Sequence, residues 1–336
     1  MKKSNILFVL LLIGLLVWVL CSRGSSYQVG TDAEWSALKD KAATEVMIAA
    51  GWSQPRLLGP SVNSVGWEDS LCIAEDGETL WFAYIPCDLL NWIAKAKGDV
   101  RKFNTFKRGP VRGANPEFAI NTLECKKKGG LFAPPKISQW SETTDPIWQS
   151  ESGLAQADGR FVWNTNNPTT PTDYDTNIYL DGKRLPAPVN TDYNEDDPFY
   201  RDGELFFGSD NRPGGMGGKD LWMTRQTPDG GWTEPELLPE PINLASSDSW
   251  QCHMTRDGDF FFTSNREGPL CIYMSTRTAT GTWAEPKKVI WPSPGSKAVG
   301  VAEPTLTDDG RSLYFCILFR HNNGAYDLDI AHTVRD

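Results

Sequence analysis

Acidic and polar side chains recur a few residues ahead of each of five Asp-Gly pairs in the sequence. The residues concerned are, copy by copy, Glu68 and Asp69; Glu151; Glu195, Asp196 and Asp197; Asp248, Trp250, Gln251 and His253; and Glu303. Carboxylates that converge on one axis can bind a cation or work as an acid and base pair, because like charges held close raise the pKa of at least one of them. The alternative is structural, since an acidic residue beside a turn also accepts neighbouring backbone N–H groups.

The elements that must position these side chains come from a fivefold repeat. Each copy begins with a Gly-aromatic-x-x-Pro segment or a variant of it, reaches an Asp-Gly pair, and continues into an aromatic-rich stretch. The prolines are Pro55, Pro135, Pro186, Pro235 and Pro286, and the pairs begin at Asp76, Asp158, Asp202, Asp257 and Asp309. A unit repeated at this period cannot bury its own apolar face and has to stack on its neighbours. Because Asp-Gly favours tight hairpins, each copy parses as four short antiparallel strands, one blade of a propeller.

The sequence therefore predicts an all-β fold, a five-bladed β-propeller of four-stranded antiparallel blades over residues 51–336. The phase of the repeat predicts how the ring closes. The last copy ends after its third strand, at 327–334, whereas an unpartnered proline segment, GWSQPRLLG, lies at 51–59. We expect the N-terminal strand at about residues 51–59 to complete the last blade and remove an exposed sheet edge. Trp52, Trp232 and Trp283 occupy equivalent positions and are expected to be packing residues.

The N-terminus is expected to be a targeting segment. Lys2 and Lys3 precede an apolar run from Ile6 to Cys21, which suits a signal sequence and is short for a transmembrane span. Residues 1–27 are interpreted as a signal peptide or a retained signal anchor, and residues 28–50 as a linker or short helix. The protein is expected to be exported, to a periplasmic, outer-envelope or extracellular location, with membrane attachment through the N-terminal segment if that segment is not cleaved.

The composition narrows the classes of partner and cofactor that the protein is expected to bind. The chain has 33 basic and 43 acidic residues and a formal net charge of −10, which disfavours nucleic acid, because phosphate contacts need a basic footprint. The sequence has no CxxCH haem motif and no paired CxxC zinc motif, so no cofactor is expected beyond a divalent cation such as calcium in the central channel. Core thiols with one or two disulfides are expected from the cysteines that follow the leader, Cys72, Cys87, Cys125, Cys252, Cys271 and Cys316.

Three stretches of the repeat, SDNRPGGMGGKDLW, GWTEPELLPEPIN and TDDGRSLYF, resemble the PD40 or TolB-like propeller repeats of the bacterial cell envelope. The resemblance covers about residues 51–336 and is weakest for the copy of Asp76. It implies a WD40-like propeller in the envelope. Proteins of this family are mostly binding or scaffolding modules and their repeat residues are structural, so the resemblance carries over no catalytic residue.

One interval breaks the repeat. From Asp76 to Pro135 the chain is about 25 to 30 residues longer than the other copies predict, and we expect the added residues to follow the third strand of the first blade. The stretch from Lys95 to Lys128 has ten basic and three acidic residues. It is a candidate docking loop for an anionic polysaccharide, a lipid headgroup or an acidic protein, the alternative being a solvated excursion. Its basic residues include Arg101, Lys102, Lys107, Arg108, Arg112, Lys126, Lys127 and Lys128.

The sequence favours an exported propeller that binds or scaffolds an envelope protein or a glycan. The alternative is a carbohydrate-active enzyme, a glycosidase or lyase that uses carboxylates of the central channel. Asp197-Pro198 and Glu303-Pro304 loosely resemble the surroundings of the catalytic carboxylates in five-bladed enzymes of those classes. This alternative implies that Asp197 is the base and Glu303 the acid, and that the distance between them decides retention or inversion.

Overall fold

The fold was analysed in a computed structural model, which describes residues 32–64, 66–85, 88–91, 121–138, 151–166, 176–210, 212–322 and 324–336. The described chain is all-β apart from a short N-terminal part and the helical residues 89–91. The N-terminal part holds the helix α3 (Asp32–Thr44). No helix in these ranges has both the length and the apolar character needed to cross a membrane.

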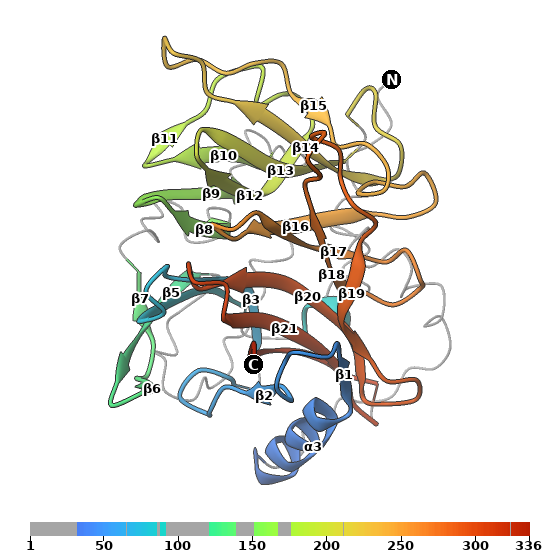
Figure 1. Cartoon of the computed structure of the whole chain (residues 1–336). Coiled ribbons are helices and arrows are strands. Elements are labelled where there is room, and N and C mark those ends of the chain that lie inside the picture. The colour runs from blue at the N-terminus through green and yellow to red at the C-terminus, as the bar shows by residue number, and fades with distance from the viewer. Residues whose placement is uncertain are drawn as a thin grey trace.

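The strands form four hydrogen-bonded sheets, coloured along the chain in Figure 1. One sheet holds β8 (Glu151–Ala157), β9 (Arg160–Asn166), β10 (Thr176–Leu180) and β11 (Lys183–Arg184). The next holds β12 (Asn194–Arg201), β13 (Glu204–Asp210), β14 (Lys219–Arg225) and β15 (Glu236–Leu237). A third holds β16 (Ser249–Met254), β17 (Asp259–Ser264), β18 (Cys271–Thr276), β19 (Lys287–Pro292) and β1 (Val46–Ile48).

The fourth sheet is the largest and has a weak point in its middle. It holds β20 (Ala298–Leu306), β21 (Ser312–Arg320), β22 (Tyr326–Val334), β3 (Trp67–Ile73), β4 (Thr79–Ile85), β5 (Asn121–Lys128) and β6 (Leu131–Phe132), with β2 (Arg56–Leu57) paired to β22 and β7 (Lys136–Ile137) paired to β5. Only one parallel pair, Leu328 with Trp67, joins β22 to β3. All other named pairings in this sheet are antiparallel.

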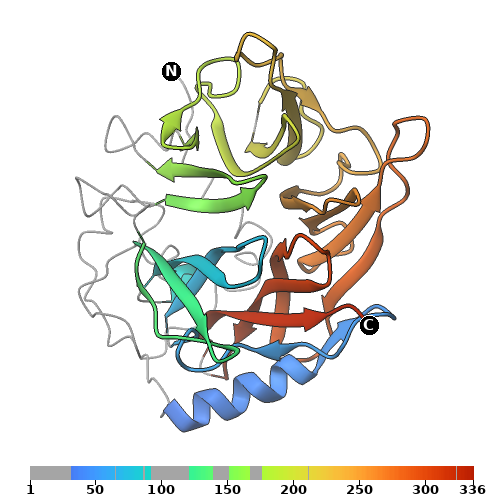
Figure 2. The same ribbon diagram turned by 60° about the vertical axis from the view of Figure 1, so that its left-hand side comes forward.

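The sheets are arranged around a common centre, as Figure 2 shows. The strands nearest this centre are β3, β8, β12, β16 and β20, which we call the inner strands. Each contacts the next, and β20 contacts β3. We call the space along the axis that these inner strands surround the central channel. One of its ends lies where the strands start and the other at the Asp-Gly turns.

The N-terminal segment joins the last strands of the chain. Arg56 pairs with His332 and Leu57 with Ala331, so β2 lies on the free edge of β22. Trp52 forms a bridge with Arg335, just as Trp232 does with Gln226 and Trp283 with Arg277. The pairing of the N-terminal segment with the last three strands is therefore present. Residues 46–48 of the expected linker also form an edge strand, β1, which the sequence did not predict.

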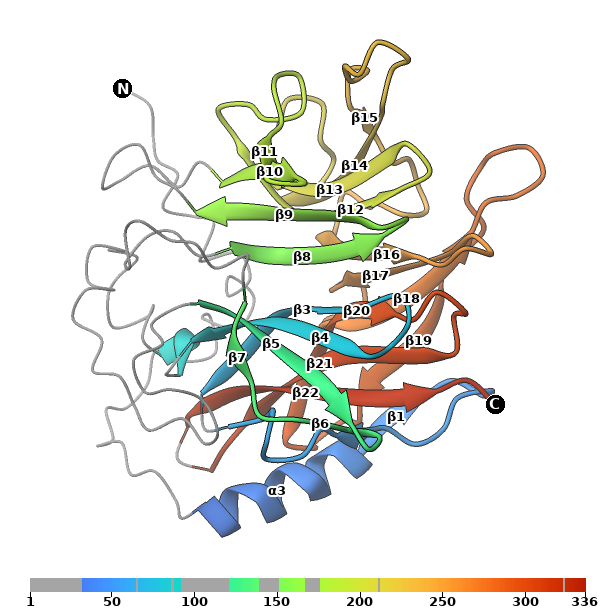
Figure 3. The same cartoon turned by 90° about the vertical axis from the view of Figure 1, so that its left-hand side faces the viewer.

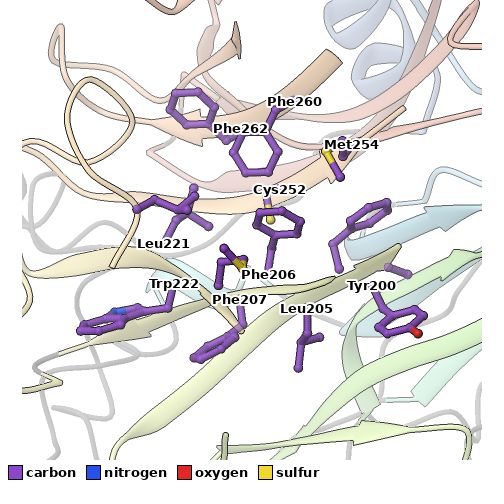
Figure 4. Packing of buried hydrophobic residues seen from close by; sticks show 14 of the residues in the cluster. Tyr200, Leu205, Phe206, Phe207, Leu221, Trp222, Cys252, Met254, Phe260 and Phe262 are labelled. Carbon is purple, nitrogen blue, oxygen red and sulfur yellow. The ribbon is translucent and has the colours of Figure 1, made fainter. Parts of the chain in front are cut away.

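Aromatic side chains fill the spaces between neighbouring sheets, as Figure 4 shows for β12, β13, β16 and β17. Phe206 on β13 lies with its ring centroid 5.2 Å from that of Phe260 on β17, and Phe260 in turn packs on Trp283 at 4.8 Å. All three are buried. Each sheet thus contributes one face to the core on either side, which explains why a single copy of the repeat could not fold alone.

The basic insertion is placed differently from the prediction. Of its residues, Arg101, Lys102, Lys107, Arg108 and Arg112 lie outside the described residues, while Lys126 to Lys128 belong to β5 and not to a loop. Because β4 and β5 pair directly, the added residues lie between the second and third strands of their group rather than after the third. Of the segment between Ile85 and β5, the structure describes residues 88–91, of which 89–91 are helical.

Five of the six cysteines outside the leader lie in the described part of the chain, and all five are buried free thiols. Cys87 lies outside the described residues. The expectation of core thiols fits these five, but none of the disulfides expected among them is formed.

Candidate active site

Every inner strand is interrupted by a β-bulge. The register shifts lie between Asp69 and Cys72, Ser152 and Ala155, Asp196 and Phe199, Trp250 and Cys252, and Ala302 and Thr305. One residue at each bulge has a left-handed backbone; we call these five the channel ring: Ser70 (φ 50°), Gly153 (φ 58°), Asp197 (φ 47°), Gln251 (φ 51°) and Glu303 (φ 61°). Bulges break the strict alternation of side chains and re-aim one of them, at a cost of about 1–3 kcal/mol for each strained residue. All five residues line one cavity of about 30 Å³ on the axis of the channel.

Glu303 has the most heavily engaged carboxyl group of the channel ring. Its Oε2 accepts a hydrogen bond from the backbone N–H of Ser70 at 2.6 Å and its Oε1 accepts one from Gln251 Nε2 at 2.9 Å. The thiol of Cys316 lies 3.2 Å from Oε2. These contacts come from three different sheets or sheet halves, so the carboxyl group is fixed in position across the channel.

A second carboxyl group, that of Asp69, faces Glu303. The Ser70 N–H that donates to Glu303 also donates to Asp69 Oδ1 at 2.8 Å, which brings the two side chains together. Burial, the charge of Asp69, a hydrogen bond shared with Asp69 and the charge of Asp197 raise the pKa of Glu303 well above its usual range. This environment favours the protonated form of Glu303, the form that a general acid needs.

Asp197 has a different environment because it lies beside a buried lysine. Its Oδ2 is 3.5 Å from Lys219 Nζ, and Lys219 also contacts Asp196 Oδ1 at 2.7 Å. Burial raises the pKa of Asp197, Lys219 acts in the opposite direction, and Asp69 raises it further. The cation thus favours the ionised form of Asp197, whereas no cation contacts Glu303 among the described residues.

The glycine at position 208 makes room for this lysine. A Cβ atom on Gly208 would lie 2.8 Å from Asp196 Oδ1 and 2.9 Å from Lys219 Cε, closer than real Cβ contacts allow. Gly208 lies on β13, opposite Asp196 in the sheet. The close approach of the strand, not a special backbone angle, is what requires glycine here.

Of the other predicted residues, some line the cavity of the channel and others are buried in the core. Gln251 belongs to the channel ring, and His253 lines the cavity with its imidazole against the Phe199 ring at 4.6 Å. Burial and, secondarily, Arg201 lower the pKa of His253 to about 3, so that it stays neutral. Trp250 is buried under Lys219 and has no exposed face for a sugar ring.

Of the remaining predicted acids, Asp248 and Glu195 have structural partners instead. Asp248 accepts the Lys219 N–H and the Asn265 side-chain amide, both at 3.0 Å. Glu195 accepts the Thr191 N–H at 2.9 Å. Glu68 is fully buried beside the helix α3 and does not line the cavity. Glu151 begins β8, and its side chain lies outside the described part.

The opposite end of the channel carries a second set of charges that the sequence argument missed. We call it the turn-end cluster: Glu75, Asp158, Arg201, Arg256 and Asp308, one residue from each inner strand or the turn that follows it. Arg201 Nη2 lies 3.2 Å from Glu75 Oε1 and 3.1 Å from Asp308 Oδ1, and Arg256 Nε lies 2.7 Å from Asp308 Oδ2. Arg256 also reaches Asp158 at 3.6 Å, and Asp158 N–H donates to Glu75. Ion pairs therefore cross this end of the channel.

A larger groove of about 560 Å³ opens beside the turn-end cluster, between the β12–β13 and β16–β17 turns. Its arginines are already paired: Glu204 contacts Arg225 Nε at 3.2 Å and Arg277 Nη2 at 2.7 Å. Size alone would favour this groove as the functional site, but its arginines are paired with acids, whereas no cation contacts Glu303 of the channel ring among the described residues.

Residues that sequence reasoning missed are Ser70, Gly153, Lys219 and Cys316. The signal for Lys219 was its place at the start of the third strand of its copy, directly ahead of the sequence Asp-Leu-Trp-Met. Cys316, in the middle of β21, has no such signal. Within the described ranges no group of three or more His, Cys, Asp or Glu side chains is arranged to hold a metal ion, and the cation beside Asp196 and Asp197 is Lys219.

No known protein family and no curated protein matches the sequence. Solved structures do match. A glycoside hydrolase aligns over 90% of this chain and 96% of its own at 8% identity and a TM-score of 0.49. The endo-arabinase from Bacteroides thetaiotaomicron aligns over 82% and 95% at 12% identity and a TM-score of 0.43. The catalytic domain of the Coprinopsis cinerea GH62 α-L-arabinofuranosidase aligns over 84% and 96% at 8% identity and a TM-score of 0.45.

The names of these three structures are those of glycoside hydrolases, a finding that contradicts the expectation of a binding or scaffolding module. The prediction relied on a family resemblance whose repeat residues are structural, and it discounted the channel carboxylates. Since every one of these TM-scores is below 0.5, the likeness carries no argument about function or mechanism, for which the residues of the channel are the evidence.

Proposed function

We propose that this protein is a glycoside hydrolase that cleaves a polysaccharide with the carboxyl groups of its central channel. One observation carries the proposal: the bulges of separate inner strands bring Asp197 and Glu303 into one cavity, and among the described residues only Asp197 has a cation beside it. Burial and Asp69 raise the pKa of Glu303 well above its usual range, whereas Lys219 opposes the rise that burial causes in the pKa of Asp197. Two carboxyl groups whose environments separate their protonation states are what acid and base catalysis requires.

In the proposed reaction Glu303 donates its proton to the glycosidic oxygen as the bond from the anomeric carbon to that oxygen breaks. Asp197 either removes a proton from the attacking water or attacks the anomeric carbon itself, and the anomer of the product distinguishes the two. A cavity of about 30 Å³ has room for one water and not for a sugar ring. The sugar must therefore bind outside the cavity and present the scissile bond to the channel ring from the end at which the inner strands start, because ion pairs cross the other end.

The roles of the two carboxyl groups are tested with Glu303→Gln and Asp197→Asn, with the exposed Glu285→Gln as a matched control. Both channel variants are expected to lose about 10²–10⁴-fold in turnover of a polysaccharide. With an aryl glycoside whose leaving group needs no proton, Glu303→Gln should recover and Asp197→Asn should not. Recovery of Asp197→Asn alone would reverse the roles, and full activity of both variants would refute the proposal.

The substrate screen should begin with α-L-arabinofuranosides, β-fructofuranosides and β-1,3-galactans, linkages that appear in the names of matched enzymes. The strands that bracket the basic insertion support an anionic polysaccharide as well. Tyr84 near the end of β4 pairs with both Glu68 and Asn121, so the insertion leaves and re-enters the sheet at the end where β3 starts. Binding of an anionic chain should weaken steeply as ionic strength rises.

We also propose that the four sheets form a closed five-bladed propeller. The single β22–β3 pair divides the largest sheet into two blades, and β2 is the outer strand of the last one, which supports closure by the N-terminal segment. Deletion of residues 51–59 should lower the melting temperature of the whole protein, and an unchanged melting curve would refute it. Export, an envelope location and the PD40 or TolB-like relationship stay predictions.

A further inference from the structure

Helix α3 buries one lysine among carboxyl groups of the last strand. Lys39 Nζ lies 2.6 Å from Asp327 Oδ2, 2.9 Å from Asp329 Oδ2 and 2.6 Å from the carbonyl oxygen of Ser64. Asp327 and Asp329 are two residues apart on β22 and therefore share a face of the strand. Figure 3 shows α3 lying along the same side of the molecule as β22 and β1. Lys39 is 6% exposed, so this contact is part of the core and not a surface ion pair.

A third carboxyl group, that of Glu68, completes what we call the Lys39 cluster: Lys39, Glu68, Asp327 and Asp329. Glu68 accepts a hydrogen bond from Ser64 Oγ at 2.5 Å. Ser64 therefore contacts both Lys39, through its carbonyl oxygen, and Glu68, through its hydroxyl group. Burial and the neighbouring acids raise the pKa of Glu68 well above its usual range and that of Asp327 to about 8.

Other charged groups near the cluster do not replace Lys39. His321 Nε2 lies 3.9 Å from Asp327 Oδ2, but burial, together with Lys39 and Lys297, lowers the pKa of His321 to about 4 and leaves it neutral. Asp40, the next residue of α3, adds negative charge near Asp329. Lys39 is therefore the cation on which the three buried acids depend.

The cluster is connected to the channel ring through the first residues of β3. Glu68 lies two residues before Ser70, whose N–H donates to Glu303 Oε2 at 2.6 Å. Cys316 Sγ makes the second connection, because it contacts the carbonyl oxygen of Glu68 at 3.3 Å and Glu303 Oε2 at 3.2 Å. A displacement of Glu68 would thus move both groups that hold this oxygen of Glu303.

We propose that Lys39 is a positioning residue for Glu303: by holding Asp329 and Ser64, whose hydroxyl group donates to Glu68, helix α3 fixes the start of β3 and with it the N–H and thiol that orient the Glu303 carboxyl group. The inference rests on the proposed function, since it assigns Glu303 the role of the acid. It makes α3 a working part of the active site rather than a linker that precedes the propeller.

The test compares Lys39→Met with Lys41→Met, an exposed lysine of the same helix. Hydrogen exchange of peptides that contain Ser70 should become faster in Lys39→Met and stay unchanged in Lys41→Met. In Lys39→Met kcat should fall about tenfold or more with KM nearly constant, because small displacements of a catalytic group are costly. The alkaline limb of the kcat/KM profile should move to higher pH, since the Ser70 N–H no longer favours the carboxylate.

A second variant separates positioning from general instability. Lys39→Met combined with Asp329→Asn removes a negative charge together with the cation, and it should restore the fold and part of the protection at Ser70. Faster exchange confined to α3, with an unchanged pH profile, would overturn the inference. If the wild-type protein cleaves no glycan, the proposed function fails, but exchange at Ser70 still decides whether Lys39 controls the start of β3.

Discussion

The two ends of the central channel use the same residue types for opposite purposes. At the turn end, Glu75 and Asp308 are paired with Arg201 and Arg256, and every acid of the turn-end cluster has a cation within 4 Å. In the channel ring, Glu303 faces two further acids and is raised in pKa by both. Compensated charges stabilise the joint between sheets. The acids near Glu303 favour its protonated form, and this difference identifies the end of the channel at which we expect catalysis.

The largest expected effect is on catalysis, from a substitution in the channel ring. Glu303→Gln should reduce kcat/KM by about 10²–10⁴-fold, because the proton donor is lost. The same change should leave the melting temperature unchanged or raise it, since a neutral amide of similar shape replaces a buried carboxyl group among like charges. Kinetics and thermal melting of one preparation test both halves. A variant that is inactive only because it has unfolded would contradict the assignment.

Arg201→Met should lower stability and leave turnover unchanged, the reverse of what we expect for Glu303→Gln. It removes the buried cation, 1% exposed, that joins Glu75 and Asp308, and breaking such a pair costs about 3 kcal/mol, the lower end of the usual range because both acids are partly exposed. Urea unfolding should show this loss, while kcat of the folded fraction stays near the wild-type value. Arg225→Met, half-exposed in the neighbouring groove, is the control. Loss of turnover without loss of stability would mean that the turn end takes part in the reaction.

The pH dependence of stability should also separate the two ends. The folded protein holds the Glu303 proton more tightly than the unfolded chain, whose glutamate pKa is about 4.3, so the free energy of unfolding falls as pH rises from there toward the folded-state pKa. Glu303→Gln should make this fall shallower. Urea midpoints measured from pH 4 to pH 8 test the sign, and a steeper fall in the variant would be the contrary result. Glu285→Gln should leave the slope as it is.

The smallest expected effect comes from Gly208→Ala. The added Cβ would press on Asp196 and Lys219 and move the ammonium group away from Asp197, so we expect a loss of about tenfold in kcat/KM and a rise in the pKa of the acidic limb. Gly59→Ala, where an added Cβ meets nothing within 4 Å, is the matched control. Equal activity of the two variants would show that Lys219 does not tune Asp197.

Much of the fold could be predicted because the repeat consists of local sequence signals. Asp-Gly pairs, proline segments and aromatic alternation predicted the all-β class, and the phase of the copies anticipated the pairing of Arg56 with His332. The order of strands around the basic insertion was wrong, since no turn residue marks where β5 begins. For the candidate site, Asp197 and Glu303 were named, but their partners Lys219 and Cys316 lie 22 and 13 residues away and carry no local signal.

The sequence by itself determined the repeated strands, the tight turns and the acidic residues that each copy places ahead of its turn, because these depend on neighbours along the chain. Only the tertiary structure decided which acids are compensated. Asp248 and Glu195 found N–H donors, Asp308 found two arginines, and Glu303 found other carboxyl groups. The ionisation of a carboxyl group depends on groups a few ångströms away, and around this channel those groups come from different sheets.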